Sequence, residues 1–553
     1  MKPVLSKLHS VSFIDVYLSI GIAFFVTILP TARVHNSGYV DPNMYIGYAT
    51  NLNWLISSGG YEYHATRLPL IMLIQFLLNI DINLFGFLYK FILVLLLSFP
   101  TIKIGRIIGV VGSRLYLGAL LLALSPLTQS AISWTMPNGF AGIFSVLLLW
   151  YGLKEHKTKL SFLVLGFLCT TAFLLNAFGS SMVLIILAVY QFKTVRNITR
   201  LFRDWCYVFL GIMSGGLAYQ IYWTMILKYP GIMWESHFRV IFSEEVVTNW
   251  QPLSNLWAQG VVSFSLIGIA FLIYFLNLGK FEDKEVKNLL FAGLVGCSYG
   301  WLTFILHYNF SFTSFWYFYI YIPLYVFAGL IFCKLVEKRF TAVFFFLISG
   351  AILYLEFANT LMPKLQSYQP YLQVALYGLV TAILLLSALR KHHGIKTLAS
   401  SAVIISSALA LLLQFAMPSL LVAFQNTSNQ YSIGLLKDEI VYNKTLETLN
   451  PTFGKVATWY EPDPSGYRGS IISSSSFHLL RLEGPTANSN PLRSDYWISK
   501  TGGLPECIVM ITSKKWTDKG ELENFRKFNL IKVVNLTESS NAIRIYCDKE
   551  VRS

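Results

Sequence analysis

Charged side chains are scarce in this chain. Only 13% of its 553 residues are Asp, Glu, Lys or Arg, whereas about a quarter of an average soluble domain is charged. Apolar residues make up 55% of the chain, and the mean hydropathy is +0.55. This composition argues against an ordinary soluble enzyme and excludes a largely disordered chain. It indicates a protein that uses lipid as a solvent.

The sequence also lacks the spacings that bind zinc or nucleic acid. Its six cysteines and nine histidines form no Cys-x-x-Cys pair and no Cys/His zinc pattern. The net charge of +15 is accompanied by no zinc-finger, RNP or helix-turn-helix motif. Lys and Arg instead occur in short clusters between apolar blocks, which is the pattern of membrane topology. We therefore expect no nucleic-acid partner.

Apolar blocks long enough to cross a bilayer recur through residues 1–424. They predict 13 membrane-spanning helices, at 16–30, 82–102, 115–133, 139–153, 160–176, 178–192, 205–227, 257–279, 288–307, 315–333, 340–360, 371–389 and 398–424. With a cytoplasmic N-terminus, the inner loops hold 21 Lys and Arg residues, and the outer loops before the tail hold five. This bias favours that orientation and places the tail outside.

The composition changes abruptly after residue 424. Residues 425–553 carry 16 basic and 14 acidic residues, with β-type runs at 507–512, 530–535 and 542–547 and an amphipathic helical pattern at 518–528. The predicted fold is thus an α-helical polytopic membrane protein, with a transmembrane domain at 1–424 and a small extracytoplasmic α/β domain at 425–553. An oxidising compartment favours a disulfide between Cys507 and Cys547, and two buried thiols are the alternative.

The first outer loop, residues 31–67, carries polar and aromatic residues in a distinctive order. Asp41 directly precedes Pro42, so it is suited to cap a helix that carries Tyr45 and Tyr48 on one face. This helix is too short and polar to span, so we expect it to lie along the membrane surface. A Gly-Gly turn and a Tyr-His-x-x-Arg-Leu-Pro-Leu run follow. From the residues alone, Asp41 is either a helix cap or a functional carboxylate.

This loop resembles the opening of the GT-C superfamily of membrane glycosyltransferases, which includes protein O-mannosyltransferases, aminoarabinose transferases and other enzymes that use polyprenyl-phosphate sugars. The family pattern is approximately Asp-Glu-x-x-Tyr, a turn, and then Arg-Pro-Pro-Leu. The matching residues here are Asp41, Tyr45, Arg67, Pro69 and Leu70. Pro42 and Leu68 depart from the pattern, and Pro42 removes the second acidic residue common in that loop. The 13 spans and outward tail also look like the plan of this family.

The resemblance implies an inverting glycosyltransferase that moves a sugar from a polyprenyl-phosphate donor to an envelope glycan, lipid or protein. The reaction would take place on the outer face of a bacterial inner membrane. The resemblance assigns the general base to Asp41. Candidates for contacts with the phosphate or sugar are Tyr45, His64, Arg67 and Arg239. We expect no cofactor, and a divalent metal is not favoured because the loop offers few oxygen ligands.

The second long outer loop, residues 228–256, adds further candidates. It contains His237, Arg239 and the adjacent pair Glu244 and Glu245, among aromatic residues that suit sugar stacking. We count all four as candidate substrate contacts. The alternative is a solvated surface helix with aromatic side chains at the membrane interface.

Some charged residues lie in or beside apolar blocks. Lys90 could reach the outer phosphate region or pair with Asp81, whereas Asp15 is expected to be solvated near the inner membrane face.

Alternative functions remain for the whole chain. An O-antigen polymerase or ligase would depend on outer arginines more than on Asp41. A transporter or flippase would show paired charges in mid-membrane and internal repeats, and a structural or assembly subunit is a further alternative.

Overall fold

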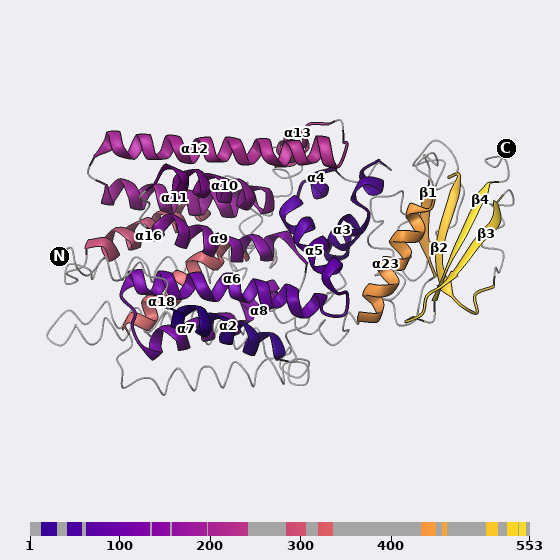
Figure 1. Ribbon diagram of the computed structural model, residues 1–553, viewed down its shortest axis with the longest axis horizontal. Coiled ribbons are helices and arrows are strands. Elements are labelled where there is room, and N and C mark those ends of the chain that lie inside the picture. The colour runs from indigo at the N-terminus through magenta and orange to yellow at the C-terminus, as the bar shows by residue number, and fades with distance from the viewer. Residues whose placement is uncertain are drawn as a thin grey trace. The chain divides into compact units, whose positions relative to one another are not determined.

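The computed structural model describes residues 13–29, 41–57, 62–132, 135–154, 158–195, 197–229, 231–241, 284–305, 319–335, 433–449, 456–461, 505–517, 528–539 and 541–548. These residues are mostly helical and include one four-stranded sheet (Figure 1). They divide into two compact units, one within Met1–Val34, Gly86–Ala218 and Arg239–Ser428 and the other within His35–Phe85, Tyr219–Phe238 and Asn429–Ser553. The helical fold with a small sheet agrees with the predicted fold class, while the domain boundary at residue 424 stays a prediction.

The first unit is built from helices that overlap the predicted spans. They are α2 (Phe13–Ile28), α6 (Phe85–Ile108), α7 (Ser113–Leu124), α8 (Pro126–Ile132), α9 (Pro137–Leu153), α10 (Lys159–Leu175), α11 (Ala177–Thr194), α12 (Ile198–Ile221), α16 (Lys284–Ile305), the 3-10 helix η5 (Tyr319–Tyr321) and α18 (Ile322–Leu335). Helix α11 packs against α9, α10 and α16, and α18 packs against α7 and α9. The spans predicted at 257–279, 340–360, 371–389 and 398–424 lie outside the described residues.

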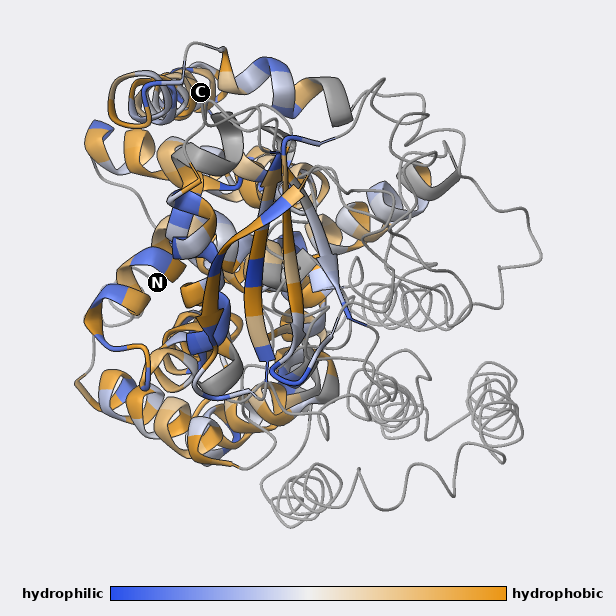
Figure 2. Cartoon of the chain, turned by 90° about the vertical axis from the view of Figure 1, so that its right-hand side faces the viewer, coloured by the Kyte–Doolittle hydropathy of each residue, from blue (hydrophilic) through white to orange (hydrophobic). Residues whose placement is uncertain are grey.

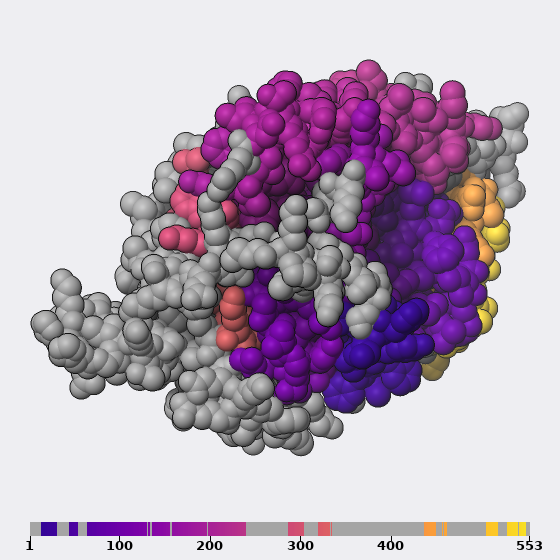
Figure 3. Space-filling view, turned by 60° about the vertical axis from the view of Figure 1, so that its left-hand side comes forward, coloured from indigo at the N-terminus to yellow at the C-terminus, as the bar shows by residue number. Residues whose placement is uncertain are grey.

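Two of these helices expose broad apolar faces. The exposed residues of α2 include Phe13, Ile14, Tyr17, Phe24 and Ile28, and those of α12 include Phe202, Phe209, Leu210, Met213 and Leu217. Both helices lie at the molecular surface in Figure 3, and the helices in Figure 2 are predominantly hydrophobic. Apolar faces of this size are rare on soluble monomers. They suit contact with lipid and favour a membrane location.

The lengths of some of the described helices also favour a membrane location. Within the described residues, α6 and α11 are long and apolar enough to cross a membrane. Shorter apolar helices, such as α2, α9 and α10, accompany them. The total of 13 spans therefore stays a prediction.

The predicted span at 115–133 differs from the structure, where it is divided into α7 and α8. Ser125 lies between the two helices with an extended backbone (φ −60°, ψ 143°). Proline lacks an N–H and disfavours a helical conformation in the residue before it. Pro126 therefore ends one helix at Ser125 and begins the next.

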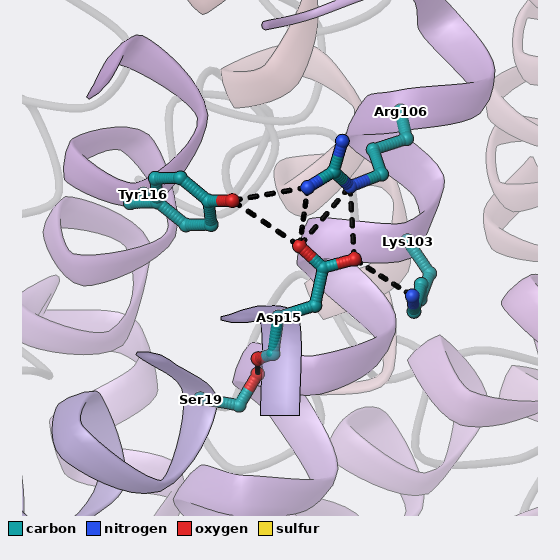
Figure 4. Close-up of polar contacts among 5 residues, drawn as sticks. All are labelled: Asp15, Ser19, Lys103, Arg106 and Tyr116. Atoms are coloured by element: carbon teal, nitrogen blue, oxygen red, sulfur yellow. Dashed lines mark hydrogen bonds and ion pairs between the residues drawn. The ribbon is translucent and has the colours of Figure 1, made fainter. Parts of the chain in front are cut away.

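The expectation that Asp15 is solvated is wrong. Its side chain is fully buried in the first turn of α2, which begins three residues before the predicted span. Lys103 Nζ donates to Asp15 Oδ2 (2.7 Å), Arg106 Nε donates to both carboxylate oxygens (2.9 and 3.1 Å), and the Tyr116 hydroxyl donates to Oδ1 (3.2 Å) (Figure 4). The carboxylate thus joins α2 to α6 and α7. We call these four residues the Asp15 cluster.

The second unit contains the helices of the first predicted outer loop and the described part of the tail. Its helices are α3 (Asp41–Ser57), α4 (Glu62–Ala65), α5 (Leu68–Ile80), the π-helix η1 (Tyr222–Ile226), the first part of α13 (Met233–Ile241) and α23 (Ile433–Glu447). Helix α3 packs against both α5 and α23. The helix predicted to start at Asp41 thus corresponds to α3.

The tail forms a mixed sheet in the order β1-β2-β4-β3. Its strands are β1 (Val456–Tyr460), β2 (Cys507–Ser513), β3 (Phe528–Asn535) and β4 (Asn541–Asp548). Strand β1 pairs parallel with β2, and the other pairs are antiparallel. The three predicted β-type runs are confirmed as β2, β3 and β4, whereas α23 and β1 were not predicted. Residues 518–527 of the predicted helix lie outside the described residues.

A disulfide joins Cys507 of β2 to Cys547 of β4, and the two residues lie directly opposite each other in the sheet. Both are almost completely buried. A cross-link between positions 40 residues apart restricts the unfolded chain, and such bonds stabilise a domain by about 2–4 kcal/mol. The bond therefore holds the central strands together.

Replacing both cysteines with serine is expected to destabilise the tail sheet by about 2–4 kcal/mol. Hydrogen exchange of the β2 and β4 amides in the intact protein should then become faster, and reductant should have a similar effect on the wild type. Cys206→Ser is the matched control, because Cys206 is an exposed free thiol. Unchanged exchange in the double variant would contradict a stabilising role for the bond.

Candidate functional site

Helix α3 brings Asp41 and Tyr45, the first part of the loop motif, into the second unit. It begins at Asp41, and Pro42 follows in the first turn, a position where a missing N–H has no cost. Tyr45 and Tyr48 are both buried, at 3% and 1% exposure. The ring of Tyr45 lies 6.0 Å from that of His64, between centroids. The motif residues Tyr45 and His64 therefore lie close together, although they belong to two different helices, α3 and α4.

The turn between α4 and α5 positions Arg67. Its main-chain N–H donates to the carbonyl of His64 (3.2 Å), and its carbonyl accepts from the N–H groups of Leu70 (3.0 Å) and Ile71 (3.2 Å). Pro69 stands in the first turn of α5, where its fixed φ favours helix initiation. Arg67 is only 7% exposed. This arrangement holds a buried guanidinium at the start of α5, next to the His64 segment.

Helix α13 adds a histidine from the second predicted outer loop. His237 is fully buried, and its Nδ1 lies 3.0 Å from the hydroxyl oxygen of Thr66, the residue before Arg67. Either the threonine hydroxyl donates to a bare Nδ1, or a protonated Nδ1 donates to the hydroxyl. This contact links residues of the two long loops that are predicted to lie outside, at 31–67 and 228–256.

The side chain of Gln220 fixes the start of α13. Its Oε1 accepts from the N–H of Met233 (3.0 Å), and its Nε2 donates to the carbonyl of Gly231 (3.4 Å). Gln220 thus satisfies an N–H in the first turn of α13, where no helical partner exists. Neither Gln220 nor Thr66 was among the residues predicted from the sequence. A polar residue near the end of a predicted span was the available signal for Gln220.

The structure brings together four of the predicted site residues: Tyr45, His64, Arg67 and His237. For Asp41 and Arg239 it describes the backbone, in α3 and α13, and Glu244 and Glu245 lie outside the described residues. Among the described side chains, no group of three or more His, Cys, Asp and Glu residues is placed to hold a metal ion. Activity without a metal stays a prediction.

Lys90 forms a polar contact in the first unit. It is fully buried in α6, and its Nζ donates to Oε1 of Gln129 in α8 (3.0 Å), whose Nε2 donates to the carbonyl of Ala123 (2.6 Å). The described partner of Lys90 is therefore a neutral amide rather than Asp81. The carboxylate of Asp81 accepts from the N–H and Nδ2 of Asn83 (2.7 and 3.0 Å). The suggested contact of Lys90 with a lipid phosphate stays a prediction.

Comparison with known proteins gives a likeness to solved structures alone. No family model matches the chain, and no curated protein matches its sequence. The structure of ArnT from Cupriavidus metallidurans in the apo state is similar to this chain, with 12% identity and a TM-score of 0.46. The match covers 96% of this chain and 97% of the ArnT chain. The structure of the same protein bound to undecaprenyl phosphate gives 11% identity, a TM-score of 0.45 and the same coverage.

Proposed function

We propose that this protein is an integral membrane glycosyltransferase that transfers a sugar from a polyprenyl-phosphate donor to a hydroxyl of an envelope glycan, lipid or protein. The observation that carries the proposal is the buried Arg67, which lies beside His64 and is joined through Thr66 to His237. The planar fork of an arginine suits a phosphate, because it can donate two parallel hydrogen bonds to the phosphate oxygens. The GT-C-like motif of the same loop supports this assignment.

In the proposed reaction, the acceptor hydroxyl attacks the anomeric carbon of the sugar. The Asp41 carboxylate takes the hydroxyl proton as a new carbon–oxygen bond forms. The bond between the anomeric carbon and the phosphate oxygen breaks, and its electron pair stays on the polyprenyl phosphate that leaves. A single displacement of this kind inverts the configuration at the anomeric carbon.

Arg67 would stabilise the negative charge that develops on the leaving phosphate. Charge-assisted hydrogen bonds are stronger in a site from which water is excluded, and a donor already held in place needs no reorganisation during the reaction. The low exposure of Arg67 meets this condition. His64 and His237 would supply further donors, and Tyr45 would hold His64 in place through the ring contact between them.

The proposed topology puts the N-terminus in the cytoplasm of a bacterium and the tail domain in the periplasm. The site then faces outward, where Arg239, Glu244 and Glu245 would contact the sugar or the acceptor. We propose no cofactor and no resident metal. An O-antigen polymerase or ligase would also join lipid-linked glycans outside, but it would depend on outer arginines more than on Asp41.

Undecaprenyl phosphate is a direct probe of the proposed donor site, since it carries the lipid and phosphate of the donor. The purified protein is expected to bind it more tightly than undecaprenol, which lacks the phosphate. Arg67→Ala should weaken binding of the phosphate lipid by about 10- to 100-fold, because a hydrogen bond to a charged group contributes roughly 1.5–3 kcal/mol. Binding is measured by titration in detergent micelles.

Arg200→Ala is the matched control for this test, because the Arg200 side chain is 60% exposed on α12. It should leave binding unchanged. Equal affinity for the two lipids would contradict the phosphate site. Unchanged binding in a folded Arg67→Ala variant would remove Arg67 from it.

A further inference from the structure

Helix α3 is broken at Asn51, within the segment that carries the candidate site. Asn51 has φ −140° and ψ 45°, which lie outside the helical range, and its side chain is 6% exposed. Sharp breaks in a helix arise where a side chain or another group replaces its internal hydrogen bonds. The adjacent Thr50 hydroxyl donates back to the carbonyls of Ile46 (3.1 Å) and Gly47 (2.9 Å), so its bonds stay within α3.

The amide of Asn51 instead reaches out of its own helix. Its Nδ2 donates to the main-chain carbonyl of Asn443 in α23, 392 positions further along the chain. Helix α23 packs along α3, as Figure 1 shows. The kink in α3 is thus held by the first described helix of the tail.

Helix α23 is fixed at its other side to the tail sheet. The buried carboxylate of Asp438 accepts from the main-chain N–H groups of Ser539 (2.8 Å) and Glu538 (3.4 Å), which lie between β3 and β4. Lys437 forms an ion pair with Glu538 at 3.8 Å. The direction of α23 is therefore set by the sheet, and α23 in turn contacts the kink.

The part of α3 before the kink carries the residues of the candidate site. Tyr45 lies six positions before Asn51 and contacts His64, while Asp41 begins the helix. A helix is stiff over a few turns, so a change of angle at Asn51 moves this part as one body. Contacts therefore run from the tail sheet through Asp438, α23 and Asn51 to Tyr45.

We propose that Asn51 is a positioning residue through which the tail domain sets the placement of Asp41 and Tyr45 by its hydrogen bond to Asn443. This inference rests on the proposed glycosyltransferase function. It gives the tail domain a part in the transfer step, in addition to any contact with the acceptor. Loss of the bond should lower kcat more than it raises the KM for the donor, because Asn51 itself would not contact the donor.

The test compares variants of Asn51 in the full-length protein. Asn51→Leu and Asn51→Asp both keep the approximate size of the side chain and lose the N–H donor, and both are expected to lower kcat about 10- to 100-fold, since small misplacements of catalytic groups have effects of this size. The donor KM and the binding of undecaprenyl phosphate should change less than about threefold, well below that effect. Asn51→Gln keeps an amide donor and should recover part of the lost kcat.

Thr50→Val is the matched control, because it removes a neighbouring hydroxyl whose bonds stay within α3. It should leave kcat within about twofold of the wild type, well below the effect expected for misplacement. Hydrogen exchange gives a readout independent of activity. Amides of residues 44–49 should exchange faster in Asn51→Leu, and those of β2 should not.

The outcomes separate this inference from the proposed function. A wild-type protein that neither binds undecaprenyl phosphate nor transfers sugar would overturn the function itself. A wild-type protein that transfers sugar, with Asn51→Leu and Asn51→Asp as active as Thr50→Val, would overturn only the positioning role. The positioning role would also be overturned if kcat fell only as far as the folded fraction in Asn51→Leu and Asn51→Asp, and Asn51→Gln recovered none of it. The bond would then only stabilise the fold.

Discussion

Replacing Asp41 with asparagine is expected to lower the rate of sugar transfer by about 10²- to 10⁴-fold, which is the range that a positioned general base contributes. Asparagine caps a helix as well as aspartate does, so the variant should keep the start of α3 at this position. It cannot accept the proton of the attacking hydroxyl. The rate is measured with the lipid-linked donor, or as the envelope glycan profile of cells that produce the variant.

Binding of undecaprenyl phosphate should be retained in Asp41→Asn, because the proposed phosphate contact is Arg67. Asp81→Asn is the matched control, since the Asp81 carboxylate lies in the loop after α5 and accepts hydrogen bonds from Asn83. It should leave transfer near the wild-type rate. A normal glycan profile with normal levels of Asp41→Asn would remove Asp41 as the base and favour the polymerase or ligase alternative.

The parts of the fold that could be predicted from the sequence depend on local signals. Asp41-Pro42 and Arg67-Leu68-Pro69 stand at the starts of α3 and α5, and Asn176 caps α11 through the N–H of Gly179 (2.9 Å). Short runs of β-type residues predicted three of the four described strands. Such signals lie within a few residues of the element they define, so they can be recognised without knowledge of the packing.

The contacts that depend on distant residues could not be predicted in the same way. The partners of Asp15 lie 88 and 91 positions away in α6, and Thr66 and His237 are separated by 171 positions. In the sequence, Asp15 is a lone carboxylate beside an apolar block, for which solvation is the simplest expectation. Only the packing of α2 against α6 and α7 shows that it is buried and paired.

The candidate site includes residues that local signals could predict and residues whose contacts depend on distant parts of the chain. Tyr45, His64 and Arg67 could be selected because they belong to one motif of the first outer loop. His237 was selected from a loop rich in polar and aromatic residues, but its partner Thr66 was not foreseen. Asn51 gave no signal at all, because its role depends on a carbonyl in the tail. A motif can therefore suggest candidate residues for the chemistry, whereas the residues proposed to position them depend on tertiary packing.

Replacing Asp15 with asparagine is expected to destabilise the first unit by about 3–5 kcal/mol, the cost of removing one partner from a buried ion pair. The carboxylate is fully buried and accepts hydrogen bonds from Lys103, Arg106 and Tyr116. Without it, the two cations would lie close together with no negative charge between them. The loss of stability is measured as a smaller fraction of protein that remains folded on heating in detergent.

Asp204→Asn is the matched control for the Asp15 cluster. Asp204 also pairs with two arginines, Arg200 (3.7 Å) and Arg203 (3.4 Å), but their side chains are 60% and 63% exposed. Exposed pairs of this kind contribute about 0–1 kcal/mol, so the control should melt near the wild type. A double variant, Asp15→Asn with Lys103→Met, should be more stable than Asp15→Asn alone because it removes one uncompensated buried cation. Asp15→Asn as stable as Asp204→Asn would show that the cluster does not hold α2 against α6 and α7.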